Sequence, residues 1–126
     1  SRPTIHDDLV NALEKLDRQR YKAEKILDMT QYVLKQSRKA GRKDATRTMR
    51  EARKAIVSYG KTNAERAKAL FDIRHKKIKL NNKGGIQNVA NKLKKASKAH
   101  AAQAKTLEKI AKKSKGGMAD YYKDIL

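Results

Sequence analysis

The sequence contains no cysteine, a single proline (Pro3) and only six glycines in 126 residues. Without cysteine, the chain can form neither a disulfide nor a thiolate zinc site, and it has no cysteine nucleophile. Because proline and glycine are the strongest helix breakers, their scarcity in a chain rich in Ala, Lys, Arg, Leu and Glu predicts long helices.

Long apolar runs are also missing. No stretch of 18 apolar residues occurs, so we expect no membrane-spanning segment. The first 16 residues contain Asp7, Asp8 and Glu14 and lack a central apolar stretch, so we expect no signal peptide.

Acidic residues are few relative to basic ones. The chain has 33 Lys and Arg against 13 Asp and Glu, a formal net charge of +20. Self-repulsion on this scale opposes compaction, and binding to a polyanion would relieve it. The sequence therefore indicates a polyanionic partner, with DNA, RNA and an anionic membrane surface as candidates.

The remaining pattern predicts one all-α domain over residues 1–126, an elongated antiparallel three-helix bundle with a short C-terminal helix. The helices are expected at about 6–39, 44–80, 86–115 and 118–126, because apolar residues recur at helical spacing there. Thr4 is the expected N-cap of the first helix, with Asp7 three residues on, and Gly41 is its expected left-handed stop.

In the second segment, the expected apolar face includes Met49, Ala52, Ile56, Tyr59, Ala67, Leu70, Ile73 and Ile78. Gly60 lies inside that helix, which suggests a bend or a close crossing of another backbone. Asn81, Asn82, Gly84 and Gly85 are expected to form the next turn. Many of the core positions are alanine, so the core is expected to be thin.

The basic residues are patterned along the chain. Residues 1–36 hold 7 basic and 6 acidic side chains, for a net charge of +1, whereas residues 37–82 hold 15 and 4, for +11, and residues 83–126 hold 11 and 3, for +8. One stripe in the second helix consists of Lys43, Arg47, Arg50, Lys54, Lys61 and Lys68, and a second stripe in the third helix consists of Lys95, Lys98, Lys105, Lys109 and Lys112. The first stripe is expected opposite the apolar face of the second helix, and this more basic helix is expected to be the main contact element.

These stripes predict sequence-independent contacts with phosphates. The candidate nucleic-acid-binding residues are Arg42, Lys43, Arg47, Arg50, Arg53, Lys54, Lys61, Lys68, Arg74, Lys76, Lys77, Lys95, Lys98, Lys105, Lys109 and Lys112. Aromatic residues are few and fall mostly on packing faces, and no zinc-finger, RRM or GXXG signature is present. Double-stranded DNA is the favoured partner, and RNA is possible.

Residues that often carry chemistry have simpler interpretations. His100 falls on the apolar face of the third helix, where a packed core histidine is expected, and His75 lies within a basic run. Helix-start electrostatics explain Asp7 and Asp8 beside His6. We therefore expect no catalytic residues, no metal site and no cofactor, and the protein is not expected to be an enzyme.

The C-terminal segment is a candidate assembly element. Met118, Tyr121, Tyr122 and Ile125 recur at helical spacing, with Leu126 after them. These side chains either fold back on their own bundle or dock on a neighbouring subunit. Self-association, or assembly with a paralogous subunit, is therefore expected.

The long basic helices, the absent cysteines and the small residues of the core resemble the major coat proteins of filamentous or rod-shaped archaeal viruses. The resemblance is architectural and involves no motif, so it implies no functional residues. It implies a virion subunit that coats double-stranded DNA. The chain also resembles small three-helix ribosomal proteins, which implies a ribosomal or nucleoid RNA- or DNA-binding protein in the cytoplasm or nucleoid. A third hypothesis is a basic helical toxin fragment bound by an acidic protein.

Overall fold

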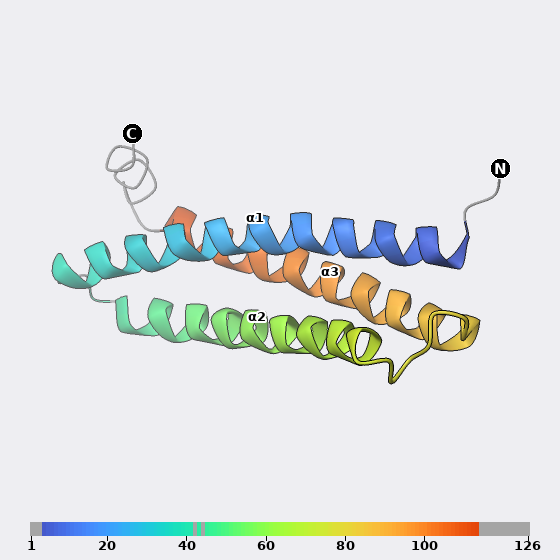
Figure 1. Ribbon diagram of the computed structural model, residues 1–126. Helices are drawn as coiled ribbons and strands as arrows, with labels where there is room; N and C mark the ends of the chain where they lie inside the picture. The colour runs from blue at the N-terminus through green and yellow to red at the C-terminus, as the bar shows by residue number, and fades with distance from the viewer. Residues whose placement is uncertain (1–3, 42, 44, 114–126) are drawn as a thin grey trace.

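The computed structural model describes residues 4–41, 43 and 45–113, which form three helices: α1 (Ile5–Lys39), α2 (Ala45–Arg74) and α3 (Lys83–Lys113). Within these ranges there is no strand, so the predicted all-α, three-helix fold is confirmed. The helices lie side by side in an elongated bundle, with α2 running opposite to both others (Figure 1). The short helix predicted at 118–126, and Arg42, lie outside the described residues.

The start of α1 follows the predicted local chemistry. The Thr4 hydroxyl accepts a hydrogen bond from the Asp7 amide at 3.1 Å, and the Asp7 carboxylate accepts one from the Thr4 amide at 3.0 Å. These bonds lower the pKa of Asp7. At the other end, Gly41 adopts a φ of +68°, as expected for a glycine after a helix.

Helix α2 ends at Arg74, which is six residues earlier than predicted. Lys76 takes a φ of +59°, and the Ile78 amide donates to the Asp72 carbonyl at 3.1 Å, which folds the chain back over the last turn. Lysine rarely adopts positive φ, so the sequence carried no stop signal at this point. The prediction of helix through residue 80 was wrong.

Helix α3 begins three residues earlier than predicted. The Asn82 side-chain oxygen accepts a hydrogen bond from the Gly85 amide at 3.0 Å and thereby caps the helix. Gly84 and Gly85 belong to the first turn of α3 and not to the expected loop. A Cβ on Gly85 would lie 2.9 Å from Ile78 Cγ2, so the close approach of the preceding loop explains a glycine there.

Helix α3 is the centre of the packing. It contacts α1 most extensively and α2 next, whereas α1 and α2 contact each other little. In Figure 1, α3 runs obliquely between the other two helices. The buried face of α3 therefore adjoins both other helices, and the opposite side is left to solvent.

Two apolar clusters make up most of the core. The first is formed by Ala12, Leu16, Ala69, Val89, Leu93 and Ala96, and the second by Leu27, Leu34, Ala52, Ala55, Leu107 and Ile110. Nine of the nineteen buried apolar residues are alanine, which allows close helix approach but buries little area per residue. The core is therefore thin, as predicted.

A polar layer lies between the two clusters. Gln103 of α3 donates from its side-chain nitrogen to the hydroxyls of Ser58 and Thr62 on α2, both at 2.9 Å, and its oxygen lies 2.7 Å from His100 Nδ1. The Tyr59 ring packs on the His100 ring with centroids 5.0 Å apart. His100 is fully buried, as predicted for a core histidine.

The predicted apolar face of α2 is largely confirmed. Ala52 is buried, and Met49, Ile56, Tyr59 and Ile73 pack against the two apolar clusters. Ala67 was wrongly placed on that face, because it is exposed, whereas Ala55, Thr62 and Ala69 are buried. Gly60 is exposed, and a Cβ built on it would meet nothing within 4 Å, so no other backbone crosses closely there.

Candidate nucleic-acid interface

The outward side of α3 is rich in lysine. Its members, called here the α3 ridge, are all exposed: Lys95, Lys98, Lys105, Lys109 and Lys112. They lie opposite the wide buried face of the same helix, because α3 is packed on both sides by its neighbours. The ridge spans about 25 Å at 1.5 Å per residue.

One acid interrupts this surface. Glu108 is the only acidic residue of α3, and its carboxylate lies 2.9 Å from Lys112 Nζ. The hydrogen bond from Lys112 lowers the pKa of Glu108. The pair neutralises one of the five ridge lysines, and the other four form no ion pair with a described residue.

The basic stripe of α2 borders the α3 side of that helix. Its members within α2, called here the α2 row, are exposed: Arg47, Arg50, Lys54, Lys61 and Lys68. Lys54 and Lys61 lie four residues before and three residues after Ser58, whose hydroxyl is bonded to Gln103 of α3. They therefore share the side of α2 that adjoins α3. Arg53 and Lys43 are also exposed but lie outside this row.

A shallow pocket between α2 and α3 shows how charges mix at one end of this surface. It is lined by Lys68, Lys92 and Lys95 together with Glu65 and Asp72. The two carboxylates offset much of the positive charge there. The middle of the α3 ridge, between this pocket and the Glu108–Lys112 pair, is therefore the more favourable place for a phosphate.

Helix α1 presents opposite charges on its two flanks, which the net charge of +1 over residues 1–36 concealed. On the α3 side, Lys15 lines a pocket with Lys94 and Lys98. Asp8 lies there as well, and hydrogen bonds from Lys94, at 3.0 Å, and Gln87 lower its pKa. Lys15 therefore extends the basic surface around α3, which a count of charges per segment could not reveal.

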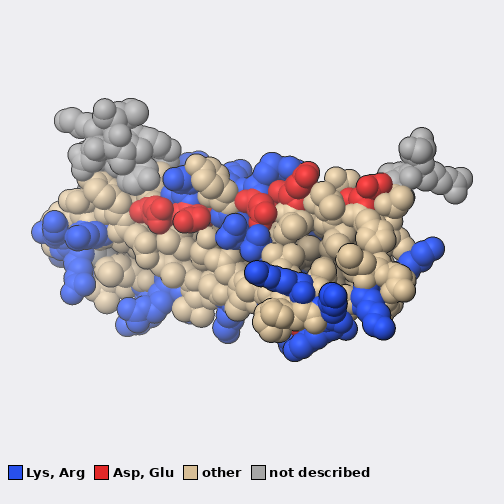
Figure 2. All heavy atoms as spheres, viewed as in Figure 1, with Lys and Arg blue, Asp and Glu red and all other residues tan. Residues whose placement is uncertain are grey.

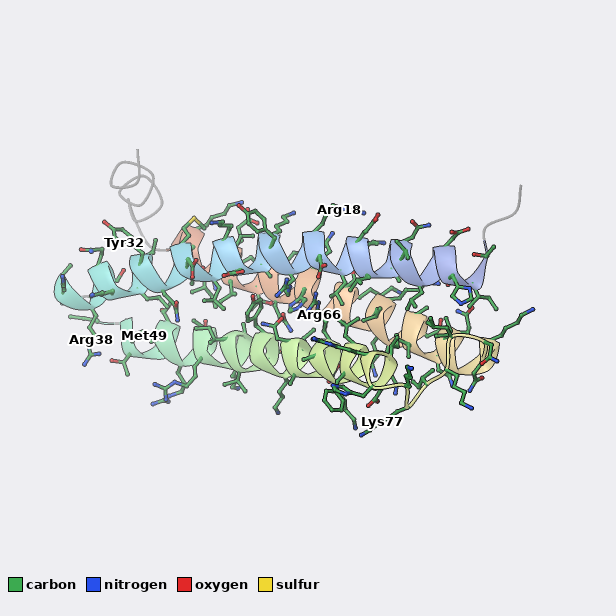
Figure 3. The ribbon with its side chains drawn as sticks, in the orientation of Figure 1. Arg18, Tyr32, Arg38, Met49, Arg66 and Lys77 are labelled. Carbon is green, nitrogen blue, oxygen red and sulfur yellow. The ribbon has the colours of Figure 1, made fainter. Side chains whose placement is uncertain are left out.

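The other flank of α1 is acidic. Glu14, Asp17, Glu24 and Asp28 share one side of the helix, and Asp17 Oδ1 lies 3.0 Å from Arg66 of α2. Figure 3 shows Arg66 reaching from α2 toward α1. In the view of Figure 2 the acidic residues form a row along α1, and basic residues line the α2 edge below it. The sequence signal that could have predicted this acidic flank is the spacing of the four acids by 3, 7 and 4 residues, which places them on one side of a helix.

The remaining predicted contacts lie at one end of the bundle. Arg74 is the last residue of α2, and Lys76 and Lys77 follow in the connection to α3. All three are exposed, but they do not continue the α2 row. Lys77 Nζ lies 5.1 Å from the centre of the Phe71 ring, and the His75 ring packs on Phe71 at 4.0 Å. Figure 3 shows Lys77 at the outer edge of this end.

Other kinds of site find little support in the described part of the chain. No group of three or more His, Asp or Glu residues is placed to hold a metal ion there. None of the three helices is long and apolar enough to cross a bilayer. His100, the one buried histidine, belongs to the polar layer and touches no pocket described here.

The fold and the surface together define an all-α three-helix bundle with its charge divided by face. Comparisons of the chain with protein-family models, with curated proteins and with solved structures found no match in any of the three. The function is therefore argued from the surface alone.

Proposed function

We propose that the protein binds nucleic acid through the phosphate backbone and serves as a structural packaging protein. The observation that carries the proposal is the α3 ridge, a lysine-rich surface with a single acid. Because only the Glu108–Lys112 pair offsets it, this surface of like charge pays a repulsive cost that a polyanion removes. In its most concrete form, the protein is a coat subunit that covers double-stranded DNA in a virion.

The chemistry of the surface favours backbone contact over base reading. Lysine is a flexible point charge that binds phosphate without geometric specificity, and the ridge contains no arginine, asparagine or glutamine to pair with a base edge. Duplex DNA has one charge per roughly 1.7 Å of its axis with both strands counted, so a duplex segment as long as the 25 Å ridge carries about fifteen phosphates. Binding driven by counterion release and independent of sequence follows from this arrangement.

The α3 ridge is proposed as the centre of contact, with the α2 row and Lys15 as its flanks. The sequence alone favoured the second helix, because its segment has the largest net charge. Helix α3 is preferred here because it lies between the two flanks. Of the α3 ridge, only Lys95 lines the pocket that holds Glu65 and Asp72, so these acids leave the charge of the other ridge lysines in place.

The test is a salt titration of binding to unrelated DNA duplexes and to an RNA duplex. Replacing Lys98, Lys105 and Lys109 with Gln should reduce the slope of log K against log salt by about 2.7 units, at 0.9 per lost contact. A matched variant replaces Arg18, Lys25 and Lys35, exposed bases of α1 outside the ridge, with Gln, and should change the slope by less than one unit. Equal losses from both variants, or no salt dependence in the parent protein, would refute the proposal.

A further inference from the structure

The exposed face of α1 that carries its acids has a second regularity. Val10, Glu14, Asp17, Tyr21, Glu24 and Asp28, called here the acidic row, are spaced 4, 3, 4, 3 and 4. This is the heptad spacing by which one helix packs along another. The row contains no basic residue, although the chain carries a net charge of +20.

The row also exposes apolar side chains without cover. Tyr21 is 63% exposed and Val10 is 52% exposed. Lys25 Nζ lies 5.1 Å from the centre of the Tyr21 ring, on the edge of the row. Glu14, Glu24 and Asp28 form no ion pair with any described residue, whereas Asp17 is shared with Arg66. Apart from Asp17, the row is therefore a helix face without a partner among the described residues.

A face of matching spacing and opposite charge occurs on α2. Val57 and Ala64 fill the two remaining heptad positions of the α2 row, so the full order is Arg47, Arg50, Lys54, Val57, Lys61, Ala64 and Lys68, spaced 3, 4, 3, 4, 3 and 4. Val57 is 51% exposed. Val57 is thus an exposed apolar residue flanked by basic residues, just as Tyr21 is an exposed apolar residue flanked by acidic ones.

We infer that the acidic row of one copy docks antiparallel on the α2 row of a second copy, with Tyr21 against Val57. In an antiparallel contact, residues at the same number of positions from the central pair face each other. Three pairs of opposite charge follow from this register: Glu24 with Lys54, Asp28 with Arg50 and Asp17 with Lys61. The contact joins two apolar side chains and flanks them with three pairs of opposite charge.

The two rows cannot satisfy each other within one chain. Asp17 of α1 faces Arg66 of α2 inside the bundle, whereas Lys54 and Lys61 border the far side of α2, next to α3. Each copy therefore offers one row to each of two neighbours. Such a heterologous contact builds an open chain of subunits or a ring. It covers the α2 row, which then no longer flanks the nucleic-acid contact, and it leaves the α3 ridge and Lys15 of every copy free.

The contact is small, about 17 Å along each helix from residue 17 to residue 28, so a covalent trap is the suitable probe. The cysteine-free sequence allows two single variants, Tyr21→Cys and Val57→Cys, to be mixed under mild oxidation without nucleic acid. Salt of about 150 mM shortens long-range repulsion to about 8 Å and leaves close pairs effective. We expect the mixed disulfide to exceed both homodimers severalfold, against about twofold for random collision. A matched mixture of Arg18→Cys with Val57→Cys should give the random proportion.

Charge reversal tests the pairing itself. Glu24→Lys with Asp28→Lys should abolish the excess of mixed disulfide, and so should Arg50→Glu with Lys54→Glu in the Val57→Cys chain. Combining the two reversed chains should restore it. Random proportions in the first mixture, or a failure of the combined chains to recover, would overturn the inference. Because no nucleic acid is present, either result leaves the proposed DNA binding to its own test.

Discussion

The buried histidine makes the stability of the bundle depend on pH. His100 Nδ1 lies 2.7 Å from the Gln103 side-chain oxygen, which can only accept, so Nδ1 carries the proton. Nε2 is buried and has no hydrogen-bond partner among the described atoms. Adding a second proton there would bury a charge near Arg20 and Arg66. Burial is the larger cause that lowers the pKa of His100, and these two cations lower it further.

The sign follows from the proton count. Because the pKa is lower in the folded state than in the unfolded state, the unfolded chain takes up the proton first as the pH falls below about 6.5. The folded state is therefore fully stable above that pH and loses at most about 1.4 kcal/mol per pH unit below it, or about 2 kcal/mol by pH 5. The pKa values of Asp7, Asp8 and Glu108 are lowered, so the stability that these carboxylates contribute is lost only below about pH 5.

The assay is urea unfolding followed by circular dichroism at pH values from 8 to 5. The control is His100→Gln, which does not titrate and should show no slope in that range, even if it is less stable than the parent at pH 8. A parent protein whose unfolding free energy stays flat down to pH 5 would refute the account of the polar layer. So would a variant with the same slope as the parent.

Two further predictions concern glycines and the C-terminus. Gly60→Ala should raise the unfolding free energy by up to about 1 kcal/mol, because the site is helical and open. Gly85→Ala should give no such gain, because the added Cβ would lie 2.9 Å from Ile78 Cγ2. Thermal unfolding of the two variants compares them, and equal gains in stability would contradict the close approach at Gly85. Deleting residues 118–126 should leave the monomer's thermal midpoint unchanged and prevent long nucleoprotein assemblies in electron micrographs. A truncated monomer that loses several degrees of stability yet still coats nucleic acid would show that the segment belongs to its own bundle.

The helix ends that the sequence predicted well are those with local chemical signals. Thr4, Asp7 and Gly41 act on their nearest backbone groups, so no tertiary information was needed. The end of α2 was missed because it depends on Lys76 adopting positive φ, and Ile78 continued the apolar pattern past it. The start of α3 was missed because Gly85 is required by packing against Ile78 and not by a turn.

The exposure of the basic stripes followed from helical spacing, but their neighbours did not. Which flank of α1 faces α3 depends on how the three helices are arranged around one another, and the apolar pattern does not encode this arrangement. Lys15 was therefore assigned to a neutral helix, although it lies beside Lys94 and Lys98. The polar layer also escaped prediction, since Ser58 and Thr62 show no sequence signal for bonding to Gln103.

The central position of α3 sets the order in which the chain can fold. Most contacts of α1 are made with α3 and few with α2, and the Thr30 hydroxyl donates to the Leu107 carbonyl across 77 residues of sequence. A nascent chain that ends before residue 83 therefore has an α1–α2 hairpin with little to bury, and closing the long loop precedes any gain from packing. Folding on the ribosome must wait until α3 has emerged, and a chain truncated before that helix should be degraded rapidly by proteases.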